Sequence, residues 1–378
     1  MGKKIEKLSK GWLITGLIGG LLLGSEPIGW IAVPVHAATD PATVTTSKQL
    51  QTKLAEGMAA RNTTITVKYK GSTKNLEKQL KQAVNDALDA DPYTKYIVDR
   101  YVYSWRGTTG SAKITLQVHY RETAQQTAYV QQKVKEILKQ QIEPGMDTHQ
   151  KVKAIHDYVV LNLKYDTDLQ KYTAFEGLKT GEAVCQGYAL LTYELLKEAG
   201  IENRLVEGTA GDQLHAWNLV RLDNRWYHLD TTWDDPVPDL PNRVNYTYYL
   251  RTDEQMRKDH TWAAADYPPA TVPYLKTLQA LIEGSGAKKG TYLALKTALG
   301  YDLYEASAAV SSARGLVDKV KDSLKDGKST LTVRYAGTDQ QQLLEDLAEL
   351  YNLGIRNIRY LMQPLEGTED LRVEIHWE

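Results

Sequence analysis

One short strand pattern occurs twice in the chain, with a segment of different character between the copies. Residues 64–71 read Thr-Ile-Thr-Val-Lys-Tyr-Lys-Gly, and residues 330–337 read Thr-Leu-Thr-Val-Arg-Tyr-Ala-Gly. Apolar and polar residues alternate in both, as they do in half-buried antiparallel strands. The copies lie 266 residues apart, which is too far for a solenoid array. The pattern therefore predicts two related small α/β modules that flank a central domain.

Each module is expected to follow the order helix, strand, helix, strand, strand. The expected helices cover 47–60, 76–87, 316–324 and 341–351, and the expected strands cover 64–70, 96–105, 112–120, 330–335, 355–362 and 371–377. The last strands are aligned so that His119 matches His376, and both histidines are expected to be structural or exposed to solvent. Neither module contains a cysteine or a glycine-rich phosphate loop, so we expect both to bind or support rather than catalyse.

The first 37 residues are expected to lie outside the fold. Four lysines precede an uncharged apolar run over 11–24, and Val35-His36-Ala37 supplies small residues at a cleavage position. This layout is typical of a secretory signal peptide. The run has 14 residues, whereas a membrane span needs about 20, so an uncleaved anchor is the less favoured alternative. We expect a secreted protein, in one interpretation associated with the cell surface, without stable membrane insertion after cleavage.

The domains predicted from these patterns are a signal peptide over 1–37, an N-terminal module over 38–121, a core over 122–272, and a helical linker with the C-terminal module over 273–378. The chain has 46 basic and 47 acidic residues, so no overall positive charge indicates a nucleic-acid partner. A single cysteine, Cys185, excludes an internal disulfide and a cysteine-rich zinc site. We expect no cofactor.

The position of Cys185 indicates a use for its thiol. Apolar residues over 185–199 recur at helical spacing and Gly200 follows them, so a helix is expected over 183–199 with Cys185 in its first turn. The free N–H groups and the positive dipole end of a first turn stabilise a thiolate and a developing oxyanion.

A predicted hairpin supplies a base and an acid. Strands are expected over 213–222 and 225–232, joined by Asp223-Asn224, which is a two-residue turn signal. In that register His215 and Asp230 lie diagonally on one face, within side-chain reach, and His228 shares the face. A cysteine nucleophile needs a base within reach, and the base needs a third group that fixes its tautomer. Cys185, His215 and Asp230 supply these three chemistries.

The local sequences strengthen this interpretation. Residues 181–189 (Gly-Glu-Ala-Val-Cys-Gln-Gly-Tyr-Ala), 215–218 (His-Ala-Trp-Asn) and 228–234 (His-Leu-Asp-Thr-Thr-Trp-Asp) resemble the transglutaminase-like superfamily, particularly its secreted bacterial branch. Residues 248–268 also resemble the segment that closes this branch's domain. The resemblance covers about 125–270. It implies an α+β, papain-like fold in which Cys185 is the nucleophile, His215 the general base and acid, and Asp230 the group that orients His215.

Other site candidates are weaker. Trp217 and Trp233 could form walls of the site or pack in the core, Tyr165 could donate to the oxyanion, and Gln186 could do no more than cap the helix. A metal site made of His215, His228 and Asp230 is disfavoured because it leaves Cys185 unexplained.

Three function classes follow from the sequence. The first is an enzyme that forms a thioester from a protein or peptide amide. In one interpretation, this substrate belongs to the cell wall or the cell surface. Water then resolves the thioester, as in a protease or amidase, or an amine does, as in a crosslinking transglutaminase; hydrolysis is modestly favoured. The second is a secreted binding module on an inactive scaffold. The third, a structural protein of the cell surface, has no sorting signal or stalk to support it.

Overall fold

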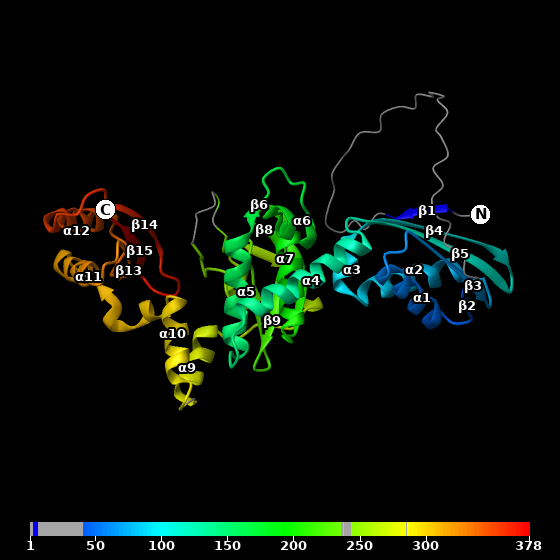
Figure 1. Ribbon diagram of the computed structural model, residues 1–378, viewed down its shortest axis with the longest axis horizontal. Helices are drawn as coiled ribbons and strands as arrows, with labels where there is room; N and C mark the ends of the chain where they lie inside the picture. The colour runs from blue at the N-terminus through cyan, green and yellow to red at the C-terminus, as the bar shows by residue number, and fades with distance from the viewer. Residues whose placement is uncertain (1–2, 7–40, 236, 238–242, 285) are drawn as a thin grey trace, which may run out of the picture. The chain divides into compact units, whose positions relative to one another are not determined.

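The computed structural model describes residues 3–6, 41–235, 237, 243–284 and 286–378, and it combines helices with several sheets (Figure 1). One compact unit extends to Tyr274, and a second spans Leu275–Glu378. The N-terminal module and the core belong to the first unit. Lys3–Glu6 forms strand β1, which pairs with β4 (Val98–Thr108), so these four residues lie in a sheet although the sequence placed them outside the fold. The predicted cleavage site lies outside the described residues.

The N-terminal module is a sheet covered by helices. Its strands follow the order β1-β4-β5-β3-β2, and α1 and α2 pack their apolar side chains against one face of it (Figure 1). The further elements are β2 (Thr43–Val44), α1 (Ser47–Ala59), β3 (Thr64–Lys70), α2 (Leu76–Asp89), α3 (Pro92–Ile97) and β5 (Ser111–Tyr120).

Helix α3 is the main difference from the pattern expected for this module. The sequence predicted a strand from residue 96, because tyrosine and valine are common there and favour strands. In the structure the Asp91 side chain accepts a hydrogen bond from the Thr94 N–H, and Pro92 begins the helix. An aspartate N-cap followed by proline is a helix-start signal. The strand therefore begins at Val98, after the helix has ended.

The second unit contains a sheet with the same order of strands as the N-terminal module. The order β12-β13-β15-β14 corresponds to β2-β3-β5-β4, with a parallel edge pair followed by two antiparallel pairs. The elements of this unit are α9 (Tyr274–Gly284, which begins at the last residue of the first unit), α10 (Lys289–Ala298), η2 (Tyr301–Tyr304), η3 (Ala306–Ala308), β12 (Ala309–Val310), α11 (Ala313–Lys325), β13 (Thr330–Tyr335), α12 (Gln340–Ala348), η4 (Glu349–Leu353), β14 (Arg359–Pro364) and β15 (Leu371–His376).

The register of the last strand corrects the alignment of the two modules. Thr64 pairs with Gln117, whereas Thr330 pairs with His376, so His376 occupies the position of Gln117 and not that of His119. The shift is two residues, which keeps the same side chains on the buried face. Both histidines are exposed. That the modules arose by duplication is our proposal.

The core places a buried helix against an antiparallel sheet. Helix α7 (Cys185–Glu198) packs on β8 and β9 and is flanked by α4, α5 and α6 (Figure 1). The sheet has the order β10-β9-β8-β11. The other elements are α4 (Ala124–Gln141), α5 (Thr148–Asn162), β6 (Lys164–Tyr165), α6 (Ala174–Thr180), β7 (Glu182–Ala183), β8 (Asn203–Ala210), β9 (Gln213–Leu222), β10 (Arg225–Leu229), α8 (Asp253–Met256), β11 (His260–Trp262) and η1 (Ala264–Asp266).

The hairpin has the register that the sequence predicts. Leu222 pairs with Arg225 and Leu219 with His228, across a turn in which Asp223 and Asn224 both have positive φ. Two positive φ values identify the primed turn that suits the twist of a hairpin. Strand β10 ends at Leu229, however, so Asp230 lies just beyond the ladder and not within it.

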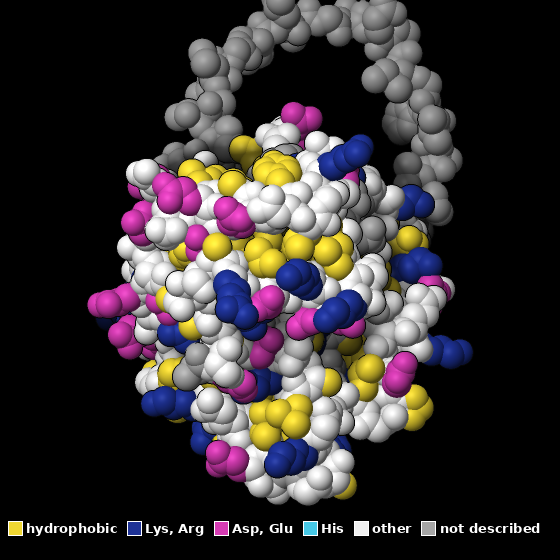
Figure 2. All heavy atoms as spheres, turned by 90° about the vertical axis from the view of Figure 1, so that its left-hand side faces the viewer, with side chains coloured by type: hydrophobic (Ala, Val, Ile, Leu, Met, Phe, Trp, Pro, Cys, Tyr) yellow, Lys and Arg dark blue, Asp and Glu magenta, His cyan; other side chains and the backbone are white. Residues whose placement is uncertain are grey.

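The surface shows no concentration of positive charge on the face in Figure 2. Acidic and basic side chains are interspersed there with small apolar patches, in keeping with the nearly balanced charge of the chain. Across the described residues, no helix has the length and apolar composition that a membrane span requires.

Candidate functional site

Cys185 is the first residue of α7, two residues later than the predicted start of the helix. Val184 is the N-cap, and its carbonyl accepts hydrogen bonds from the N–H groups of Gly187 and Tyr188. The segment before the helix is also fixed, because the Val184 N–H donates to the Lys171 carbonyl at 2.8 Å and β7 pairs with β6. The first-turn N–H groups of Cys185 and Gln186 have no partner within the helix by helix geometry. The thiol is therefore held beside the positive end of a buried helix.

His215 and Asp230 form a tight buried pair. His215 Nε2 donates to Asp230 Oδ2 at 2.6 Å. The other carboxylate oxygen, Oδ1, accepts the backbone N–H groups of Thr232 at 3.0 Å and Trp233 at 3.2 Å. The turn that follows β10 thus orients the carboxylate. Since Nε2 of His215 is engaged by Asp230, Nδ1 is the ring nitrogen left for a second partner.

The Cys185 thiol lies close enough to His215 to contribute to the pKa of its ring. Burial of His215 disfavours its charged form, but the negative charge and hydrogen bond of Asp230, with Cys185 next, outweigh burial and raise the pKa of His215 to about 10. Burial likewise opposes ionisation of Asp230, but His215 and then His260 hold the pKa of this carboxyl below its ordinary value. The environment therefore favours an imidazolium beside an ionised carboxylate.

His260 also contacts Asp230, and sequence reasoning gave it no role. His260 Nε2 lies 3.1 Å from Asp230 Oδ2, and its Nδ1 lies 2.5 Å from Asp259 Oδ1. Tyr248 donates its hydroxyl to the other oxygen of Asp259 at 2.6 Å. A continuous chain of hydrogen bonds therefore runs from His215 through Asp230 and His260 to Asp259 and Tyr248.

The structure does not bring His228 together with His215 and Asp230, the other two residues of the alternative metal site. His228 is engaged elsewhere: its Nδ1 accepts the Trp217 indole N–H at 2.8 Å and its Nε2 lies 2.9 Å from Asp253. Ligand-type atoms of His215, Asp230 and His260 do lie within 4.8 Å of one another. Both imidazoles, however, already direct a ring nitrogen at Asp230 at hydrogen-bond distance.

The four weaker candidates lie near the site in different roles. Trp217 stacks on His215 with ring centroids 5.7 Å apart, but its N–H is bound to His228 and so is not available to an oxyanion. Trp233 is 36% exposed and its ring lies 6.1 Å from that of His215, as a site wall would. Tyr165 is half-buried; burial, and then the nearby Cys185, raise its pKa to about 12, so it keeps its proton. Gln186 reaches a carbonyl of α3 instead of capping its own helix.

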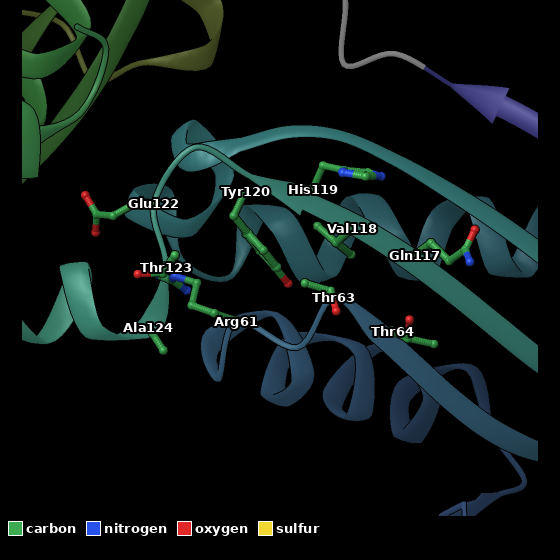
Figure 3. Close-up of a pocket in the computed structure, with 10 residues that line it drawn as sticks. All are labelled: Arg61, Thr63, Thr64, Gln117, Val118, His119, Tyr120, Glu122, Thr123 and Ala124. Carbon is green, nitrogen blue, oxygen red and sulfur yellow. The ribbon is translucent and has the colours of Figure 1, made fainter. Parts of the chain in front are cut away.

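A separate pocket of about 420 Å³ lies where β3 and β5 approach the start of α4 (Figure 3). Arg61 and Tyr120 lie together on one side of β5, and His119 leaves its opposite face. None of the predicted site residues lines this pocket.

Comparisons with known proteins agree with the sequence resemblance. The family model described as Transglutaminase-like superfamily matches residues 135–231, which include Cys185, His215 and Asp230. Kyphoscoliosis peptidase from Mus musculus is 24% identical over 187 residues, which are 43% of this chain and 28% of that protein. The chain thus spans under a third of the length of this relative.

Two solved structures also overlap with the chain. A transglutaminase has a TM-score of 0.28 at 14% identity, covering 55% of this chain and 62% of its own. A proposed cysteine protease from Cytophaga hutchinsonii has a TM-score of 0.26 at 16% identity, covering 47% of this chain and 75% of its own. The segment that holds Cys185, His215 and Asp230 therefore matches the transglutaminase-like superfamily.

Proposed function

We propose that the protein is an exported cysteine-dependent enzyme that transfers acyl groups from protein or peptide amides through a thioester. Cys185 is the nucleophile, His215 the general base and acid, and Asp230 the group that orients His215. The observation that carries this proposal is the buried His215–Asp230 pair, with Cys185 beside His215 in the first turn of a buried helix.

The reaction would proceed in two halves. The Cys185 sulfur attacks the amide carbonyl, its proton having passed to His215, and the first-turn N–H groups of α7 donate hydrogen bonds that stabilise the charge developing on the carbonyl oxygen. When the carbon–nitrogen bond breaks, His215 gives its proton to the departing amine and an acyl thioester remains. His215 then takes a proton from the incoming water or amine, which attacks the thioester, and returns that proton to the Cys185 sulfur as the thioester breaks.

Hydrolysis is the favoured outcome of the second half. Water is the acceptor that needs no site of its own, and the mouse relative carries the name of a peptidase. Transfer to an amine would make the protein a crosslinking transglutaminase, with the same thioester step. We further propose a secreted location, at the cell surface in one version, on the basis of the signal-like first 37 residues.

One observation favours the alternative of an inactive binding module. Cys185 is only 3% exposed and His215 only 7%, so the thiol is nearly closed to solvent in this structure. An inactive binding module has no need of an accessible thiol, so burial of Cys185 would not impair it.

A paired assay separates these functions. Fluorogenic peptide hydrolysis and incorporation of a labelled amine into casein are measured side by side on the unaltered chain and on Cys185→Ala. Activity in either assay that Cys185→Ala abolishes supports the enzyme, and the assay that responds identifies the acceptor. Activity that survives Cys185→Ala, or rapid iodoacetamide labelling of Cys185 only after denaturation, contradicts the proposal.

A further inference from the structure

A second buried histidine–carboxylate pair lies close to the His215–Asp230 pair in the chain. His156 of α5 and Asp234 both have no exposed surface, and Nε2 of His156 lies 3.0 Å from Oδ2 of Asp234. Asp234 follows Asp230 by four residues, in the turn after β10, and its backbone N–H donates to the Asp230 carbonyl at 3.2 Å. The second pair therefore belongs to the same turn as the carboxylate that contacts His215.

The Tyr248 backbone connects the two aspartates of this turn. Its N–H donates to Asp234 Oδ1 at 2.8 Å, and its carbonyl accepts the Asp230 N–H at 3.2 Å. Three residues further on, Arg251 exchanges both backbone hydrogen bonds with His228 of β10, at 2.8 and 2.9 Å. Tyr248 is thus aligned along the end of β10, and a displacement of Asp234 would move the backbone that holds Asp230.

The Tyr248 side chain reaches the same carboxylate by another route. Its hydroxyl donates to Asp259 at 2.6 Å, and Asp259 contacts His260, whose Nε2 lies 3.1 Å from Asp230 Oδ2. The Tyr248 ring also packs edge-on against Trp233, with ring centroids 5.1 Å apart. The position of Tyr248 therefore affects Asp230 both through the backbone and through His260.

His156 also fixes this segment through its ring. Tyr246 stacks on the imidazole with ring centroids 5.3 Å apart, and Tyr249 meets it edge-on at 5.0 Å. These two tyrosines lie on either side of Tyr248 in the sequence. Helix α5 thus holds the chain around Tyr248, and His156 supplies both the ring contacts and the hydrogen bond to the turn.

Both ring nitrogens of His156 are engaged by carboxylates. Nδ1 lies 3.1 Å from Oδ1 of Asp157, whose other oxygen binds the Lys153 ammonium. Asp157 is partly exposed, whereas Asp234 is fully buried. Loss of the imidazole would remove the donor that Asp234 Oδ2 has in the structure, and a buried acceptor that loses its donor is costly. The turn would therefore rearrange to satisfy the Asp234 carboxylate.

We propose that His156 is a positioning residue of the acyl-transfer site. Through Asp234 and Tyr248 it fixes the turn after β10. That turn presents the Asp230 carboxylate to His215, so the geometry of this pair depends on α5. The inference rests on the proposed function for its effect on turnover, but its effect on the His215–Asp230 hydrogen bond can be measured without turnover.

The protonation of His215 gives a readout that needs no substrate. Histidines labelled with nitrogen-15 are titrated by NMR in the folded chain, and the His215 signals are assigned by their loss in His215→Gln. His156→Phe keeps a ring between the two tyrosines but removes both nitrogens, and His156→Gln restores a donor. Because Asp230 stabilises the protonated ring, we expect the His215 midpoint to fall by about one pH unit in His156→Phe, as a tenfold weaker interaction gives, and to return at least halfway in His156→Gln.

Turnover supplies a second readout wherever peptide hydrolysis or amine transfer is detected. In His156→Phe, kcat should fall about tenfold while KM stays within about twofold, because the lost geometry acts on the transition state and not on substrate binding. His156→Gln should recover part of kcat. A rise in KM with an unchanged kcat would contradict a positioning role.

His149→Phe is the matched control. His149 is a buried histidine of the same helix, and its ring nitrogens contact Tyr274 and Asp223, both at 2.9 Å. The His215 midpoint should stay unchanged in this variant. An equal fall in His149→Phe would show general loosening of α5 and would overturn the inference.

The remaining outcomes also decide the question. An unchanged His215 midpoint in folded His156→Phe, or no recovery in His156→Gln, would overturn the inference. If His156→Phe fails to fold by circular dichroism, the shorter, polar His156→Asn takes its place, with the same fall expected and the same result overturning it. An unchanged midpoint with intact Cys185-dependent activity would refute the positioning role and leave the enzyme. A lowered midpoint in a chain without such activity would support the positioning role and refute the enzyme.

Discussion

The carboxylate of Asp230 lies at the centre of the site's hydrogen bonds. Two imidazoles contact one of its oxygens and two backbone N–H groups donate to the other. A buried carboxylate with this many donors is held in one orientation and in its ionised form. Its pairing with His215 should have a measurable effect on stability.

The free energy of unfolding should fall as the pH rises through the alkaline range. The pKa of His215 is about 10 in the folded chain against an ordinary 6.5, so between these values the folded chain holds a proton that the unfolded chain has released. Stability then falls by up to about 1.4 kcal/mol per pH unit, and the contribution is complete below the lower value. Asp230, whose pKa is lowered, contributes above its ordinary value and loses that contribution on acidification. Urea unfolding at stepped pH should show a smaller alkaline slope in His215→Gln; equal slopes would contradict the pairing.

His260 should act as a positioning residue for Asp230. His260→Phe keeps a ring but removes the donor to Asp230, a charge-assisted hydrogen bond worth about 1.5–3 kcal/mol, so kcat should fall about tenfold to a hundredfold. Asp230→Asn should cost far more, on the order of the 10⁴-fold loss known for a serine protease. His260→Gln, which restores a donor, should recover part of kcat with little change in KM. A change in KM without a fall in kcat would indicate a purely structural role for His260. So would a failure of His260→Gln to recover kcat.

Local sequence predicts that Cys185, His215 and Asp230 lie close together, but it does not add His260 to them. The first three lie within 46 residues, and the hairpin register relates two of them directly. His260 reaches Asp230 because β11 pairs with β8, at the opposite edge of the sheet from β10. No periodicity predicts this pairing. The residue does occur in the closing segment that resembles the family, and that was the one available signal.

At the scale of elements, the first turn of α7 packs closely against β7 and against the N-terminus of α6. A Cβ at Gly187 would lie 2.6 Å from Ala183 Cβ and 3.1 Å from the Thr173 carbonyl oxygen. The turn that carries Cys185 would have to move to relieve these contacts.

Gly187→Ala should therefore lower both stability and reactivity. We expect a loss of about 1–3 kcal/mol in the free energy of unfolding, as overpacking typically costs, together with slower iodoacetamide labelling of the folded chain. Gly177→Ala is the matched control, because a Cβ there would meet the flexible Leu163 side chain at 3.3 Å. It should change stability little and leave the labelling rate unaltered. A Gly187→Ala chain that labels at the normal rate would show that the first turn tolerates displacement.

The elements were predicted with unequal success for physical reasons. Helix α7 and the β9–β10 hairpin follow from spacing and turn chemistry that operate within a few residues. Helix α3 was missed because its capping signal at Asp91-Pro92 competed with strand-favouring tyrosines. The register of β15 could not be read, since a shift by two residues preserves the alternation of buried and exposed side chains.

At the scale of the whole molecule, the contacts described for the site lie within the first unit. They involve residues between Tyr96 and His260, whereas the second unit begins at Leu275. A chain that ends after Tyr274 should therefore fold and label at Cys185 within about twofold of the full-length rate, as expected for distant, independent parts. Circular dichroism and iodoacetamide kinetics check this. A large loss of labelling in a folded truncated chain would show that the second unit supports the site.

The burial of α7 on all sides affects how the protein loses activity. Every residue from Cys185 to Leu196 is buried, so the amide protons of this helix have no local route to solvent. In deuterium they should exchange only through global opening of the first unit, at the slowest rate in the chain. Heat inactivation and loss of the cooperative fold would then occur in one step, and no partly opened form with a bare thiol would accumulate beforehand.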